Sequence, residues 1–164
     1  MQLPLNVLLY KLSVNSNFET QNIDLSRNYD GIKLFDVDYV QEDERNYLYL
    51  ISESMLKSHE SLLLGQQILS SCTFLCVCGM DKTMTLDIVS PDLPVVLLYA
   101  EESFPIVFNK LLNVFHDFEM WDTRFHLALL QQKPLQELLE LTREYLVHPM
   151  VVLDRSFSLL GYIK

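Results

Sequence analysis

Residues 94–99 read Pro-Val-Val-Leu-Leu-Tyr, and this run decides the fold because it is apolar at every position. A short, continuous apolar run of this kind is typical of a strand that is covered on both faces. Tyr47–Ile51 and Thr73–Cys78 have the same character, and a helix-like stretch, Leu56–Leu69, separates them. Strands that alternate with helices predict an α/β fold with a mostly parallel sheet and flanking helices.

Three shorter segments complete the region before residue 94. Gly31–Asp36 alternates between apolar and polar residues and is expected to be a strand. Leu86–Val89 is expected to be a short strand. Val7–Leu12 fits either a strand or a helix, and the strand is favoured.

A long helix is predicted to begin at Ser103, whose hydroxyl can cap it, with Pro105 in the first turn. Eight apolar residues then recur at alternating steps of three and four, which is a coiled-coil seam. The seam consists of Phe104, Val107, Leu111, Val114, Phe118, Trp121, Phe125 and Ala128. A second stripe, Phe108, Leu112 and Phe115, occurs in the first half only and suits burial against the sheet. We therefore expect one projecting helix, roughly 40 Å long, and a homodimer formed through Val107–Ala128.

A partial second domain is expected at the end of the chain. Pro134 opens an amphipathic helix that should stop at His148, because the residue before Pro149 is pushed out of the helical region. Residues 150–153 and 157–163 then predict a β-hairpin with a turn at 154–156. The predicted organisation is an α/β domain (1–102), a connecting and dimerising helix (103–133) and the start of a truncated second domain (134–164).

Composition and charge exclude several classes of protein. The formal net charge is −10, so duplex DNA would repel the chain, and we expect it to bind no nucleic acid by itself. The apolar runs are too short to span a bilayer, and the first residues lack the features of a signal peptide. Three cysteines cannot pair off evenly, which favours reduced thiols and a cytoplasmic location.

The last elements follow one another in a characteristic order: the strand Leu93–Leu97, the helix from Ser103, the segment His126–Leu130, the helix Leu135–Leu139 and the run Val147–Asp154. This order resembles that of bacterial transcription regulators of the purine-catabolism-regulator (PucR) type. Gly31–Leu34 and Tyr47–Tyr49 also look like pieces of the N-terminal domain of such regulators. The resemblance implies an N-terminal α/β domain, a long helix and a GAF-like domain, with a helix-turn-helix further along that residues 1–164 do not contain.

Two clusters could hold a metal. Cys76 and Cys78 share one face of a strand, but a zinc site usually needs four ligands, so buried apolar thiols are favoured. Glu119, Asp122 and His126 share one face of the long helix, and a solvated face is favoured there too. No phosphate-binding or nucleophile motif appears, and we expect no metal site, no cofactor and no catalysis.

An effector site is expected where the carboxyl ends of the parallel strands meet, since open α/β sheets bind ligands there. N–H groups at the start of the long helix would add donors. The predicted ligand-binding residues are Asp36, Ser52, Gly79, Tyr99, Glu101 and Ser103. Ordinary strand-to-helix loops are the alternative reading of the same positions, and a solvated charge run is the default for the acidic loop that begins at Asp36.

These features predict the sensory and dimerising segment of a cytoplasmic transcription regulator, with an unknown small-molecule effector. The alternative is a protein-interaction or adaptor domain that binds no small molecule. A small enzyme is the third possibility and has no motif in its favour.

Overall fold

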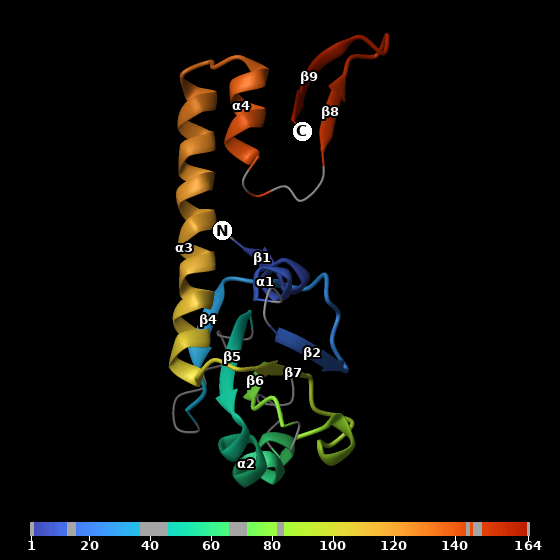
Figure 1. Ribbon diagram of the computed structural model, residues 1–164, viewed down its shortest axis with the longest axis vertical. Helices are drawn as coiled ribbons and strands as arrows, with labels where there is room; N and C mark the ends of the chain where they lie inside the picture. The colour runs from blue at the N-terminus through green and yellow to red at the C-terminus, as the bar shows by residue number, and fades with distance from the viewer. Residues whose placement is uncertain are drawn as a thin grey trace. The chain divides into compact units, whose positions relative to one another are not determined.

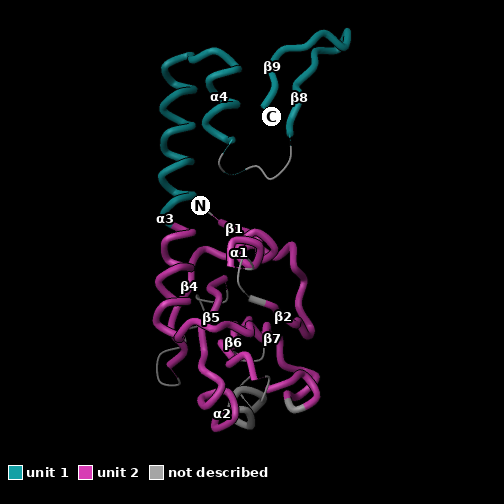
Figure 2. The backbone as a smooth tube through the Cα atoms, viewed as in Figure 1, with its two compact units in different colours: residues 1, 116–164 teal, residues 2–115 magenta. Residues whose placement is uncertain are grey.

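A computed structural model describes residues 2–12, 16–36, 46–65, 72–81, 84–143, 145 and 149–163. The chain forms two compact units, residues 2–115 (the N-terminal unit) and residues 116–164 (the C-terminal unit), shown in Figure 2. Most of the acidic loop after Asp36, residues 66–69 of the predicted helix and residues 146–148 lie outside the described residues.

A five-stranded sheet forms the centre of the N-terminal unit (Figure 1). Its strands are β2 (Ser16–Gln21), β4 (Gly31–Leu34), β5 (Tyr47–Ser52), β6 (Thr73–Cys78) and β7 (Val95–Ala100). The spatial order is β2-β7-β6-β5-β4, in which β4 to β7 are parallel and β2 is antiparallel to β7. The predicted α/β class with a mostly parallel sheet is therefore confirmed.

Both faces of the sheet are covered, which explains why its central strands are apolar throughout. On one face, Tyr49, Phe74 and Leu97 pack with Leu56 of helix α2 (Glu53–Gly65) and with residues around the short 3₁₀ helix η4 (Leu86–Ile88). The other face includes Thr73, whose hydroxyl accepts a 2.7 Å hydrogen bond from Tyr29.

Helix α1 (Leu5–Leu12) and the two-residue strands β1 (Leu3–Pro4) and β3 (Asn28–Tyr29) belong to the layer on this second face. The Leu5 N–H donates to the Arg27 carbonyl oxygen at 3.0 Å, which ties the start of α1 to the segment before β3. Figure 1 shows α1 and α2 on opposite sides of the sheet.

Two segments that were predicted to be strands have another structure. Residues 7–12 are part of α1, because Leu5, Leu8, Leu9 and Leu12 recur at helical spacing and are all buried. Leu86–Val89 forms η4 and a turn instead of a strand. The Val89 N–H donates to the Leu86 carbonyl oxygen at 3.1 Å, and this local bond satisfies the backbone without a neighbouring strand.

Helix α3 (Phe104–Leu130) contributes to both units, since the boundary between them falls at residues 115 and 116. The three-segment division at residues 103 and 134 stays a prediction. In the C-terminal unit, α3 is followed by α4 (Leu135–Thr142) and by the antiparallel hairpin of β8 (Met150–Leu153) and β9 (Leu159–Ile163), which confirms the predicted hairpin.

Helix α4 ends at Thr142, not at His148 as the proline rule predicts. The Arg143 N–H donates to the Glu140 carbonyl oxygen at 3.2 Å, and the Tyr145 N–H donates to the Thr142 carbonyl oxygen at 3.0 Å. These backbone bonds span three residues instead of four, so the chain tightens where the α-helix ends. The Tyr145 ring packs against aromatic rings of α3.

Candidate functional site

An open hollow of about 450 Å³ lies at the carboxyl ends of β5 and β6, and we call it the strand-end hollow. Ser52 and Val77 contribute from the two strands, and the first turns of α2 contribute the rest. Its lining residues are Ser52, Glu53, Ser54, Lys57 and Val77. The hollow therefore occupies the edge at which an open parallel sheet binds ligands.

The strand-end hollow presents one cation, one carboxylate and two hydroxyls. Lys57 Nζ lies 2.6 Å from Glu53 Oε1, and this hydrogen bond raises the pKa of the Lys57 ammonium. Ser52 Oγ accepts a hydrogen bond from the Met55 N–H at 3.3 Å and lies 3.1 Å from Ser54 Oγ. These groups can bind a polar molecule, and the exposed N-terminus of α2 favours negative charge beside them.

The structure brings one of the six predicted ligand-binding residues, Ser52, into this hollow. Asp36, Gly79, Glu101 and Ser103 are exposed and follow the carboxyl ends of β4, β6 and β7. Tyr99 is fully buried within β7, where its hydroxyl donates to the Met84 carbonyl oxygen at 3.0 Å.

Sequence reasoning placed Glu53 beside Ser52 at the end of the strand but missed Ser54 and Lys57 as lining residues. The predicted helix began at Leu56, so the first turn of α2 was not recognised. The available signal was the serine at position 52, which ends an apolar strand and precedes an acidic residue, as at the start of many helices.

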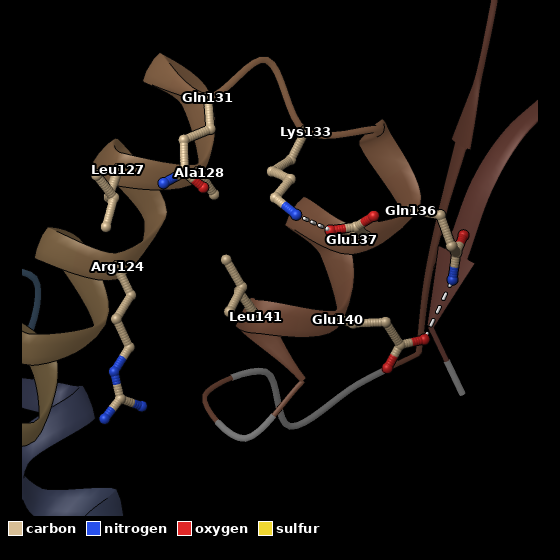
Figure 3. Close-up of a pocket in the computed structure, with 9 residues that line it drawn as sticks. All are labelled: Arg124, Leu127, Ala128, Gln131, Lys133, Gln136, Glu137, Glu140 and Leu141. Carbon is tan, nitrogen blue, oxygen red and sulfur yellow. Dashed lines mark hydrogen bonds and ion pairs between the residues drawn. The ribbon is translucent and has the colours of Figure 1, made fainter.

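A second hollow, of about 480 Å³, lies between the end of α3 and α4 in the C-terminal unit, and we call it the α3–α4 groove (Figure 3). Leu127, Ala128 and Leu141 supply its apolar part. Its polar residues are Arg124, Gln131, Lys133, Gln136, Glu137 and Glu140. A smaller hollow of about 110 Å³ shares Arg124, Glu140 and Leu141 and adds Trp121 and Tyr145.

Most polar groups of the α3–α4 groove already interact with one another. Lys133 Nζ lies 3.1 Å from Glu137 Oε2, and Gln136 Nε2 donates to Glu140 Oε1 at 3.1 Å. Figure 3 shows the Arg124 guanidinium directed away from these pairs. The groove is therefore lined by a few apolar side chains and by polar side chains that mostly pair with one another.

The predicted dimerisation seam packs within the chain along much of its length. Val107 and Leu111 are buried in the N-terminal unit together with Phe115 of the second stripe. In the C-terminal unit, the Tyr145 ring centroid lies 5.0 Å from that of Phe118 and 5.5 Å from that of Trp121. Of the remaining members, Ala128 is buried, and Phe104, Val114 and Phe125 are half-buried. A dimer along this seam stays a prediction.

The thiols of β6 lie in the core of the N-terminal unit. Cys76 and Cys78 are buried with their sulfur atoms 3.6 Å apart. The hydrogen bond between them and burial raise the pKa of the Cys76 thiol far above its ordinary value, so the thiolate is strongly disfavoured. Within the described ranges no group of three or more His, Cys, Asp or Glu side chains is placed to hold a metal ion.

The structure also contains a serine–histidine pair that was not predicted from the sequence. Ser58 Oγ and His59 Nδ1 lie 2.8 Å apart on α2. The Met55 carbonyl oxygen lies 3.1 Å from each of these atoms, and the Phe35 ring packs edge-on against the imidazole. No hydrogen bond or ion pair between the imidazole and a carboxylate is present among the described residues, so the pair lacks the orienting acid of a catalytic triad.

Comparisons with protein-family models, with curated proteins and with solved structures find no match to this chain. The resemblance to PucR-type regulators therefore stays a prediction. In the part of the chain that the structure describes, no helix is both long and apolar enough to cross a membrane.

Proposed function

We propose that this chain is the sensory and dimerising segment of a cytoplasmic transcription regulator, and that it binds a small polar effector in the strand-end hollow without catalysing a reaction. The observation that carries the proposal is the hollow itself, which lies at the ligand-binding edge of a parallel sheet and gathers Ser52, Glu53, Ser54 and Lys57. Its mixed charge suits an effector that has both anionic and hydrogen-bonding groups.

Helix α3 supplies a route by which such binding could act on the rest of the protein. It begins four residues after β7 ends, at the same edge of the sheet as the hollow, and its residues from His116 onward belong to the C-terminal unit. An effector that prefers one of two packings of this helix would shift their populations. Signalling by population shift requires binding energy but no chemistry.

A thermal-shift screen of polar metabolites tests the proposal. A compound that binds the folded state specifically must raise the melting temperature. We expect Lys57→Ala to abolish the rise and Lys133→Ala, a matched variant, to leave it intact. Both lysines pair with a glutamate one helical turn away, Glu53 and Glu137 respectively, but only Lys57 lines the strand-end hollow. If Lys133→Ala alone abolished the rise in melting temperature, the metabolite would bind in the α3–α4 groove instead.

A second candidate function is a protein-interaction domain, and the C-terminal hairpin favours it. Val151, Leu153 and Leu159 are exposed apolar residues on this small element. Large apolar side chains that gather on a surface often mark a protein contact. A screen in which no metabolite stabilises the protein would support this second function.

A further inference from the structure

The edges of the described strands differ in how well they are protected against pairing with another chain. The central sheet ends in β2, which carries Glu19, and in β4, which carries Lys33. Charged side chains on an edge strand discourage pairing. Strand β8 reads Met-Val-Val-Leu and has no charged residue at all. Its edge is thus the least protected of these three.

Strand β9, the partner of β8, has its outer edge blocked. Gln136 Nε2 donates to the Tyr162 carbonyl oxygen at 2.8 Å, and the Tyr162 N–H donates to Gln136 Oε1 at 3.1 Å. The side-chain amide of Gln136, on α4, therefore makes with Tyr162 the two bonds that a neighbouring strand would make there. Helix α4 also packs closely on this strand, since a Cβ on Gly161 would lie 2.6 Å from Leu139 Cδ1. Of the two edges of this hairpin, the β8 edge is the one to which the described residues of α4 do not bond.

The hydrogen bonds of Gln136 to Tyr162 also show to which side of β8 the backbone N–H and C=O groups of Val151 point. Because both polar groups of Tyr162 point to Gln136, Tyr162 and its partner Val151 form a pair without mutual hydrogen bonds. In such a pair, each residue directs its N–H and C=O groups away from the other strand. The N–H and C=O of Val151 therefore point outward from the free edge of β8.

From this geometry we infer that β8 pairs with β8 of a second copy of the chain, antiparallel and centred on Val151. The two Val151 residues would exchange N–H···O=C bonds across a two-fold axis and join the hairpins into one four-stranded sheet. A neutral strand lets two copies of a protein with a net charge of −10 approach without like charges meeting at the contact. This inference rests on the dimerisation part of the proposed function and places the contact between the two copies at β8 instead of along the α3 seam.

The pairing would stop at two copies. Each outer edge of the four-stranded sheet would be a β9 edge that Gln136 already occupies. The pairing would also bring the exposed apolar faces of the two hairpins together into one surface. On each hairpin, Val151 lies opposite Tyr162 and Leu153 lies opposite Leu159 on this face. A two-stranded sheet is stabilised by further strands, so the four-stranded sheet should be favoured over the separate hairpins even though α4 already packs on each β9.

Sedimentation velocity over a dilution series tests this contact. We expect wild-type protein to be a dimer that dissociates on dilution and Val151→Lys to be monomeric, because the two lysines would face each other at the two-fold axis. Leu34→Lys is the matched control, since Leu34 is 51% exposed on edge strand β4 and Val151 is 59% exposed on β8. This control should dimerise like the wild type. Circular dichroism should show that both variants keep their secondary structure.

Gln136→Ala supplies an independent test, because it frees the second edge of the hairpin. We expect this variant to form assemblies larger than a dimer and the double variant with Val151→Lys to form none. A monomeric wild type at every concentration, a dimer that survives Val151→Lys, or a Gln136→Ala variant that stops at the dimer would each overturn the inference. Metabolite binding by the Val151→Lys monomer would show that the sensory proposal stands without the contact.

Discussion

At the scale of single residues, two buried tyrosines make the stability of the N-terminal unit depend on pH. Burial raises the pKa of Tyr99 to about 12, and burial also raises the pKa of Tyr29. The neutral phenol is therefore favoured in the folded state, and the unfolded chain loses this proton at a lower pH. The resulting stability is present below a pH of about 10, the ordinary pKa of tyrosine, and decreases as the pH rises toward 12.

Tyr99→Phe should make unfolding less sensitive to alkali. Removal of the phenol removes one of the groups whose ionisation opposes folding between pH 10 and 12. At neutral pH the variant should lose about 1–3 kcal/mol of stability, because the Met84 carbonyl loses a buried donor. Urea denaturation at several pH values would measure both effects. A variant whose stability falls as steeply as that of the wild type above pH 10 would contradict this account of Tyr99.

Sequence reasoning found Ser52 and the neighbouring Glu53 at the strand end, but not Ser54, Lys57 or Val77 of the strand-end hollow. The rule that ligands bind at the carboxyl ends of parallel strands selects the correct edge of the sheet. It cannot tell that Tyr99 points into the core, because the apolar run around it makes both faces of β7 look alike. Lys57 was missed because its role depends on the first turn of α2, whose start was predicted three residues too late.

At the scale of elements, α3 shows what a periodic pattern predicts and what it leaves open. The pattern predicted one long helix that begins at Ser103, and α3 covers Phe104–Leu130. The pattern does not specify the partner of each apolar residue. Tyr145, which packs on Phe118 and Trp121, follows the last turn of α4 and lies outside the heptad pattern.

Trp121→Ala should destabilise the C-terminal unit by about 2–4 kcal/mol, because removal of a large ring leaves a cavity among the remaining aromatic side chains. The Trp121 ring lies 5.6 Å from the Phe125 ring and 5.5 Å from the Tyr145 ring. Met120→Ala, one residue away and 41% exposed, is the control and should cost much less. Denaturation followed by circular dichroism would compare them. Equal effects would show that the aromatic cluster contributes little to stability.

Gly161→Ala should loosen the hairpin from α4. The new Cβ would lie 2.6 Å from Leu139 Cδ1, so the Leu139 side chain must shift, and 3.3 Å from Gln136 Oε1, so the amide that holds Tyr162 must give way by a few tenths of an ångström. We expect a cost of about 1–3 kcal/mol and faster amide exchange at Tyr162. Gly79→Ala is the control, because its Cβ would meet only the exposed Asp81 carboxylate. Unchanged exchange at Tyr162 would contradict the close packing of α4 on β9.

At the scale of the whole molecule, the central sheet was the most predictable part. The runs at 47–51, 73–78 and 94–99 match β5, β6 and β7 to within one residue at each end. Strand β2 was not recognised, because Ser-Asn-Phe-Glu-Thr-Gln has the polar composition of a loop and forms a strand only beside β7. Helix α1 was taken for a strand because Leu5 lay outside the segment considered.

The acidic charge of the chain predicts its behaviour toward nucleic acid. At a net charge of −10, residues 1–164 should not bind duplex DNA at physiological salt, since phosphate contacts require clustered lysine or arginine. Fluorescence anisotropy with a labelled duplex would measure this. Binding that persists at physiological salt would contradict both the charge argument and the proposal that another part of a regulator reads DNA.

Hydrogen exchange along α3 tests the sensory proposal most directly. The measurement compares wild-type protein alone with protein that is saturated with the metabolite that raises its melting temperature most. We predict slower exchange around Ser52–Lys57 and changed exchange in residues 116–130 of α3, because the helix would carry the effect of binding into the C-terminal unit. Changes confined to the strand-end hollow, or the absence of any stabilising metabolite, would contradict it.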